Sequence, residues 1–179
     1  ALGQPNPNGA LQRQDLSLFK DNIAHSNGIN GLKIRDYVPE SEQMIENLSL
    51  FRNTIGTQFS DSRNVVVAGL YASDNSKCTV DMDYTDSVSI SDATIIGLSD
   101  TYRSQIASQN LWKYCNQDPR FNPPTVGIQY DHFVSNIAFF EPGHKLNNIA
   151  FSGFQNMGPA CTRAAAINVD VGHQGDPYW

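Results

Sequence analysis

One nine-residue phrase occurs twice in this chain, and it constrains the fold more than any other feature. Residues 15–23 read DLSLFKDNI, and residues 47–55 read NLSLFRNTI. Five positions are identical, two exchange Asp for Asn, and one exchanges Lys for Arg. Self-similarity at an offset of a few tens of residues indicates structural units that stack on one another. The duplication therefore predicts a solenoid rather than one closed globule.

Short segments that alternate apolar and polar residues recur along the chain, which is the pattern of strands with one buried face. The expected strands cover residues 16–19, 32–34, 65–67, 80–82, 88–90, 94–97, 126–129, 137–140, 149–154 and 167–171. Asn, Asp and Gly at their ends suit tight corners. Short strands without helical partners predict an all-β parallel β-helix. An antiparallel β-sandwich repeats strands and turns as well, and it is the alternative fold.

The expected organisation is a single run of β-helix repeats over residues 15–171. Irregular segments flank it at 1–14 and 172–179, and a long loop leaves it at about 100–124. An acidic stretch at 39–46 is expected to form one helical turn. Because neither flanking segment offers an obvious cap for a stack of strands, we expect the chain to be a segment of a longer protein.

Composition excludes some functions and favours a location outside the cell. The net charge of −6 and the pI near 5.0 argue against a nucleic-acid partner, which a basic surface would attract. No apolar run approaches the roughly 20 residues that span a bilayer. Richness in Asn, Asp, Ser and Gly is common in extracellular β-proteins. The expected location is therefore extracellular or at the cell surface, and Asn47 begins the one glycosylation sequon of the chain, a number close to that expected by chance.

The chain has three cysteines, Cys78, Cys115 and Cys161, so one internal disulfide at most can form. Cys115 and Cys161 are the candidate pair. The remaining thiol then pairs with a cysteine elsewhere or is buried and inert, and burial is the commoner case. No spacing resembles a structural zinc site.

Three carboxylates, Asp81, Asp83 and Asp86, lie within six residues and are a candidate calcium site. The alternative is a solvated strand edge, since the segment lacks the EF-hand pattern. Asp81 and Asp83 share one face of a strand, as paired carboxylates for glycoside hydrolysis must. Nothing nearby supplies a further acid. The sequence therefore favours a non-enzymatic protein, with no catalytic residue assigned and calcium as the sole cofactor candidate.

Aromatic residues in the region of the long loop are the candidate binding residues. Trp112, Tyr114 and Tyr130 carry rings that stack on sugars or bury well in protein contacts. The alternative is that these rings pack the loop onto the scaffold. Long loops that leave a rigid scaffold often carry function, and this favours recognition.

Several stretches resemble one family of large extracellular proteins. They are FKDNIAHSN at 19–27, GLKI at 31–34, YVP at 37–39, IIGLSD at 95–100 and VGIQYD at 126–131, with Trp112 and Cys115 in the loop between the last two. These stretches are similar, in the same order, to β-helix turns of fibrocystin, of the cell-migration-inducing hyaluronan-binding protein and of its transmembrane relative. The similarity extends loosely over about residues 15–155.

The resemblance implies a right-handed parallel β-helix within a long ectodomain, in a family where some members take part in hyaluronan depolymerisation and others are ciliary or surface proteins. The leading expectation is a structural or recognition module, for scaffolding or adhesion, with a glycan as one candidate ligand. Its other partners are further parts of the same polypeptide or neighbouring surface proteins. The alternatives are a segment active on a hyaluronan-type polysaccharide and a small secreted β-sandwich lectin.

Overall fold

The computed structural model describes residues 13–83, 85–108, 126–131, 144–154 and 165–169, and over these residues the chain is all-β with parallel sheets. The strands are β1 (Ile23–His25), β2 (Asn30–Arg35), β3 (Gln43–Glu46), β4 (Ser49–Phe51), β5 (Ile55–Ser60), β6 (Arg63–Ala68), β7 (Tyr71–Ser73), β8 (Cys78–Asp83), β9 (Asp86–Ile96), β10 (Val126–Asp131), β11 (Lys145–Ser152) and β12 (Ala165–Val169). One described helix, α2 (Asp100–Ser108), follows β9.

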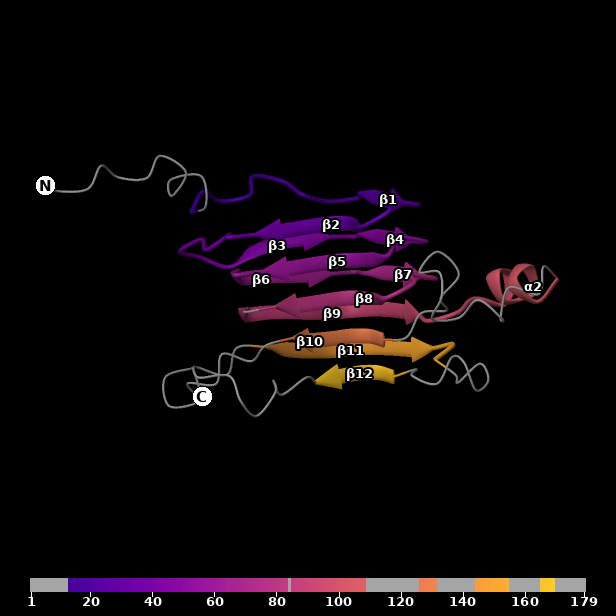
Figure 1. Ribbon diagram of the computed structural model, residues 1–179. Helices are drawn as coiled ribbons and strands as arrows, with labels where there is room; N and C mark the ends of the chain where they lie inside the picture. The colour runs from indigo at the N-terminus through magenta and orange to yellow at the C-terminus, as the bar shows by residue number, and fades with distance from the viewer. Residues whose placement is uncertain (1–12, 84, 109–125, 132–143, 155–164, 170–179) are drawn as a thin grey trace, which may run out of the picture.

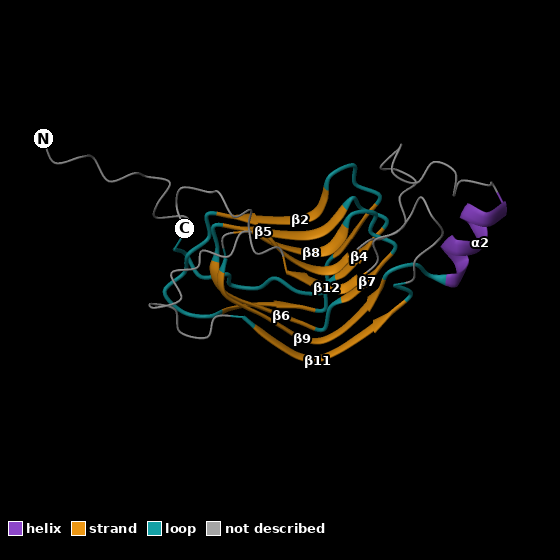
Figure 2. Ribbon diagram, turned by 60° about the horizontal axis from the view of Figure 1, so that its bottom comes forward, coloured by secondary structure: helices purple, strands orange, loops and turns teal. Residues whose placement is uncertain are grey.

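The described strands form two sheets (Figures 1 and 2), and inward side chains from both contribute to the main apolar core. The seven-stranded sheet has the order β1-β4-β7-β9-β6-β3, with β11 also paired to β9, and the five-stranded sheet has the order β12-β10-β8-β5-β2. Every described strand pair is parallel. An antiparallel sandwich is therefore not the arrangement of the described strands.

Successive passes of the chain, called coils here, stack in register. In the five-stranded sheet Leu32 pairs with Thr57, Thr57 with Val80, and Val80 with Ile128. These paired residues point inward and contribute to the core. The residue that follows each of them in its strand faces outward. The inward set contains Ile45, Leu50, Phe59, Val65, Val67, Ala72, Val80, Met82, Val88, Ile90, Ile95 and Ile128. These β-branched and aliphatic residues suit a half-buried pleated surface.

The corner before β1, β4 and β7 is built from residues that tolerate a left-handed backbone. The stacked positions with positive φ are Asp21, Asn47, Gly69, Asp92 and Asn148. Asn47 Nδ2 donates to Asp21 Oδ1 at 2.9 Å, and Asn148 Nδ2 donates to Asp92 Oδ1 at 2.7 Å. Asp, Asn and Gly adopt this conformation at the lowest cost, which explains their recurrence at the corner.

The corner after the same strands holds a ladder of amide side chains, called the asparagine ladder here, from Asn27, Asn53 and Asn75. Asn27 Nδ2 donates to Asn53 Oδ1 at 3.0 Å, across 26 residues, and Asn53 Nδ2 donates to Asn75 Oδ1 at 3.2 Å, across 22 residues. Gly31 and Gly56 make room for it, because a Cβ at Gly31 would meet Asn53 Nδ2 at 2.8 Å and one at Gly56 would meet Asn75 Nδ2 at 3.1 Å.

The stacking register differs from the offset of the duplicated phrase. Asn47, the first residue of the second copy, bonds to Asp21 and not to Asp15, and Leu50 pairs with Ala24 and not with Leu18. The sequence match therefore aligns residues that are not stacked. Stacking instead matches the corner residues, because left-handed backbone positions must coincide for the strands between them to pair.

Three expected local structures are wrong. Residues 16–19 are not a strand, although Leu16 and Phe19 pack partly buried against the core. The expected helical turn at 39–46 contains β3, whose Gln43 and Ile45 point inward. The first part of the expected loop is α2. The expected segments 88–90 and 94–97 fall mainly in one long strand, β9, while 137–140 lies outside the described residues.

Candidate functional site

The outward side of β1, β4 and β7 presents aromatic and apolar side chains, called the aromatic face here. Ala24, Leu50 and Ala72 are the inward residues of these strands. The outward positions on either side of them contain Ile23, His25, Phe51 and Tyr71. Parallel strands lie roughly 4.8 Å apart, so these side chains form closely spaced rows across the coils.

The rows of the aromatic face are ordered by direct ring contact. His25 stacks on Phe51 with ring centroids 4.8 Å apart and an interplanar angle of 4°. His25 Nδ1 also lies 3.2 Å from Ser26 Oγ. Tyr71, on the next coil, is 47 % exposed, and Ile23 is 68 % exposed. A ring face on this side of the sheet is therefore open to a ligand.

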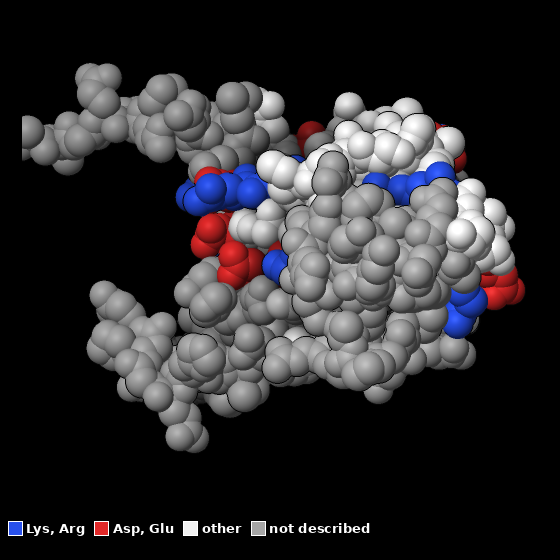
Figure 3. All heavy atoms as spheres, turned by 45° about the vertical axis from the view of Figure 1, so that its right-hand side comes forward, with Lys and Arg blue, Asp and Glu red and all other residues white. Residues whose placement is uncertain are grey.

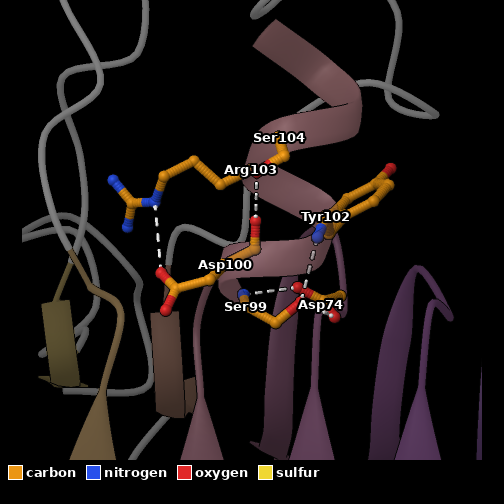
Figure 4. Close-up of polar contacts among 6 residues, drawn as sticks. All are labelled: Asp74, Ser99, Asp100, Tyr102, Arg103 and Ser104. Atoms are coloured by element: carbon orange, nitrogen blue, oxygen red, sulfur yellow. Dashed lines mark hydrogen bonds and ion pairs between the residues drawn. The ribbon is translucent and has the colours of Figure 1, made fainter. Parts of the chain in front are cut away.

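The helix α2 begins beside this face, where a cap fixes it to the corner that follows β7 (Figure 4). Asp74 accepts hydrogen bonds from the backbone N–H and the hydroxyl of Ser99, both at 2.8 Å. The Ser99 hydroxyl in turn accepts from the Tyr102 N–H at 3.2 Å. Ser99 is thus the N-cap of α2, and the Asp74 carboxylate anchors that cap to the strand stack.

A second contact ties the side of α2 to the corner that follows β4. The Arg52 guanidinium lies over the Tyr102 ring at 5.3 Å from its centroid, and Arg52 donates to Gln105 Oε1 at 3.3 Å. Burial raises the pKa of Tyr102, the negative charge of Asp74 raises it further, and Arg52 lowers it. Tyr102 therefore stays a neutral hydrogen-bonding group at physiological pH.

On the face that Figure 3 shows, the charge of the described residues is mixed rather than concentrated. Figure 3 shows basic and acidic side chains close together on the face it presents, without one broad field of a single sign among the described residues. Arg103, on α2, lies 4.0 Å from the Asp100 carboxylate (Figure 4).

The predicted acidic residues lie on a different surface. Asp81 and Asp83 share the outward face of β8, as their spacing predicts, since Val80 and Met82 point into the core. Asp81 is only 2 % exposed and accepts a hydrogen bond from Gln58 Nε2 at 3.1 Å. Asp86 begins β9 in the other sheet, and its side chain lies outside the described part. Within the described ranges, no group of three or more His, Cys, Asp or Glu is arranged to hold a metal ion.

Tyr130 is the one predicted binding aromatic that the structure describes, and it belongs to the core. It is buried among the inward residues, and its ring lies 5.3 Å from that of His144. Burial raises the pKa of its hydroxyl. This placement favours the alternative that the Tyr130 ring packs within the scaffold. Trp112 and Tyr114 lie outside the described residues.

The predicted modification sites are placed in part. Asn47 is exposed at the corner before β4, where its Nδ2 donates to Asp21. A glycan on Nδ2 would replace one of the two protons of that group and leave one for the bond to Asp21. Cys78 is fully buried in β8, as an inert thiol would be. Cys115 and Cys161 lie outside the described residues.

The aromatic face was not predicted from sequence, because its residues come from three coils. A signal was present in the asparagines: Asn27, Asn53 and Asn75 each follow a short apolar segment at the spacing of the coils. Aligning the chain on these residues brings His25 beside Phe51 and Tyr71 onto the coil that follows.

No protein-family model matches this chain, and no curated protein or solved structure matches it either. No helix in the described part of the chain is long and apolar enough to cross a membrane.

Proposed function

We propose that this chain is a segment of a right-handed parallel β-helix that works as a recognition module of a large extracellular or cell-surface protein. Support for the fold comes from the two parallel sheets and from corners that repeat across the coils. Support for the handedness comes from the general rule that connections between parallel strands of one sheet are right-handed. The resemblance to the fibrocystin and hyaluronan-binding group agrees with both.

The proposed ligand is an extracellular glycan that lies across the aromatic face. The observation that carries this proposal is the group of rings on neighbouring coils: His25 stacks on Phe51, and the exposed Tyr71 lies on the next coil, in the neighbouring row. Sugar rings have apolar faces that pack on aromatic rings, and their hydroxyls bond to polar groups beside them. Ser49 and Thr94 are the outward strand partners on either side of Tyr71, and they supply hydroxyls for such bonds.

The alternative function, cleavage of a hyaluronan-type polysaccharide, depends on Asp81 and Asp83. Their common face on β8 supports it. The burial of Asp81 and its bond to Gln58 favour binding over cleavage, because a catalytic carboxylate must reach the polymer. If the alternative holds, the chain lowers the viscosity of a hyaluronan solution, and Asp81→Asn with Asp83→Asn abolishes the effect.

Titration with hyaluronan oligosaccharides, followed by calorimetry and by NMR shifts, tests the recognition proposal. We expect Tyr71→Ala to weaken binding by about fivefold, because a stacked ring contributes on the order of 1 kcal/mol. The matched control is Met44→Ala: Met44 is 48 % exposed, against 47 % for Tyr71, and lies on β3. Binding that Tyr71→Ala leaves unchanged, or that Met44→Ala weakens equally, contradicts the proposal.

A further inference from the structure

The strand β2 lies in the first described coil, at one edge of the five-stranded sheet. In the described part of the chain, β2 is the terminal strand of the five-stranded sheet and pairs with β5 alone. Its other edge presents a row of N–H and C=O groups that can receive one more parallel strand.

An apolar hollow of about 300 Å³ opens beside this edge. Its apolar lining consists of Leu16, Phe19, Leu32, Ile34, Tyr37 and Ile45, and Lys33 and Arg35 stand at its rim. The most exposed large hydrophobic residues also belong to this coil: Leu18 at 72 %, Ile23 at 68 % and Ile29 at 73 %. Among the described residues, no strand covers the interior of the stack at this end, and it can accept apolar side chains from a partner.

The outward row of β2 is basic. Lys33 and Arg35 are exposed and alternate with the inward Leu32 and Ile34. Arg35 lies 3.6 Å from Asp36, and this exposed pair leaves most of the guanidinium in solvent. The next strand places neutral residues, Gln58 and Ser60, in the same rows. A strand added to β2 would set its own outward side chains beside these two cations.

The asparagine ladder also ends here with an acceptor available. In the ladder, the earlier coil donates its N–H and Nδ2 to the Oδ1 of the next coil, as Asn27 does to Asn53. Asn27 Oδ1 receives no such bond within the described residues. A strand that stacks in the same direction would bring a backbone N–H to this oxygen, which favours parallel addition.

From these features we propose that the β2 edge and its hollow dock an extended segment of another polypeptide that alternates apolar and acidic residues and adds to β2 as a parallel strand. The chain itself contains the matching pattern. In β8, Val80, Asp81, Met82 and Asp83 occupy the same rows as the four residues of β2 from Leu32 to Arg35, two strands away. The rows of this sheet therefore accept apolar residues inward and carboxylates outward in one register.

A short fluorescein-labelled peptide that carries Thr-Val-Asp-Met-Asp, the sequence of residues 79–83, tests the proposal by fluorescence polarisation. Its basic counterpart replaces both Asp residues with Lys. The protein variants are Lys33→Glu with Arg35→Glu, and a control, Arg63→Glu with Lys145→Glu, which makes the same charge change at exposed positions of the other sheet. Circular dichroism establishes that each variant is folded.

We expect the unmodified protein and the control variant to bind the acidic peptide, with NMR shifts centred on β2. The Lys33→Glu, Arg35→Glu variant should bind it at least about tenfold more weakly and should bind the basic peptide instead, because like charges that lie opposite each other on adjacent strands repel. If this variant does not fold, Lys33→Gln with Arg35→Gln should still show a loss of binding.

Four results overturn the proposal: equal binding of the two peptides, equal loss in the control variant, no binding of the acidic peptide, or a concentration-dependent mass in sedimentation that the Lys33→Glu, Arg35→Glu variant loses and the control variant keeps. The last would mean that a second copy of the chain occupies the edge.

Discussion

Two corners border the strands β1, β4 and β7, and both connect neighbouring coils through asparagine side chains. At the corner before the strands, Asn47 donates to Asp21 across the surface. At the corner after them, Asn53 bonds to Asn27 and to Asn75. The bonds are alike in chemistry and length, but Asn47 is exposed, whereas Asn53 is 2 % exposed and Asn75 is fully buried.

This difference in burial indicates that the side-chain hydrogen bonds stabilise the fold at the buried corner. At the exposed corner the backbone conformation of the residue matters more. At the buried corner, removing an amide leaves donors and acceptors without water, which costs free energy. At the exposed corner, water replaces the lost partner, and the positive φ of the residue matters more than its side-chain bond. Four substitutions test this contrast.

Asn53→Ala should have the largest effect, lowering the free energy of unfolding by about 3 kcal/mol. The Asn53 side chain bonds to Asn27, to Asn75 and to the Ala24 carbonyl; with alanine the Ala24 carbonyl loses this donor, and Asn75 Oδ1 keeps only the bond from the backbone N–H of residue 53. Urea denaturation measures the change. A loss below about 1 kcal/mol would mean that the ladder is replaceable by water.

Gly56→Ala should lower the free energy of unfolding by about 2 kcal/mol, because the added Cβ would stand 2.4 Å from the Thr79 carbonyl oxygen and would crowd Asn75. Gly28→Ala is the matched control, since its Cβ would have nothing within 4 Å. Thermal unfolding compares the two variants. Equal losses of stability in the two variants would show that the asparagine ladder does not need a residue without a Cβ at position 56.

Asp74→Gly should open α2 locally, with a cost of about 1 kcal/mol, because Ser99 loses the acceptor of its N–H and hydroxyl. Glycine keeps the positive φ of 58° at this position. Hydrogen exchange of residues 100–108 should quicken. The control is Asp61→Gly, at another corner with a positive φ of 48°, which should leave that exchange unchanged.

Asn47→Gly should have the smallest effect, within about 0.5 kcal/mol of the unmodified chain, since glycine tolerates the φ of 52° and water replaces the bond to Asp21. The same denaturation assay as for Asn53→Ala makes the comparison direct. Should Asn47→Gly prove as damaging as Asn53→Ala, burial would not be what separates the two corners.

The strands of the core were predictable, and the reason is local. Alternation in Val65–Val67 and in Val80–Met82 reports one buried face, and both segments are strands. Most corners were predictable as well, because Asn, Asp and Gly occupy most positions of positive φ, whereas Ser26, Arg52 and Ser87 adopt it without such a signal. Both patterns involve only residues that are close together in the sequence, so strands and corners can be predicted from a single sequence.

Features that depend on which residues stack were not predictable in the same way. The duplicated phrase favours the pairing of Leu18 with Leu50, but coils of unequal length bring Ala24 beside Leu50 instead. The β3 strand was missed because Gln43 is a buried polar residue and Pro39 precedes it. The aromatic face needs the correct register before His25 and Phe51 can be placed together.

The stacking register is the central claim, and side-chain NMR measures it directly. In isotopically labelled protein, nuclear Overhauser effects should connect the Asn53 side-chain amide to Asn75 and to Ala24, and the Leu50 methyls to Ala72. Contacts of Leu18 with Leu50 and of Asp21 with Asn53 would instead show that the duplicated phrases stack on each other, and they would contradict the account.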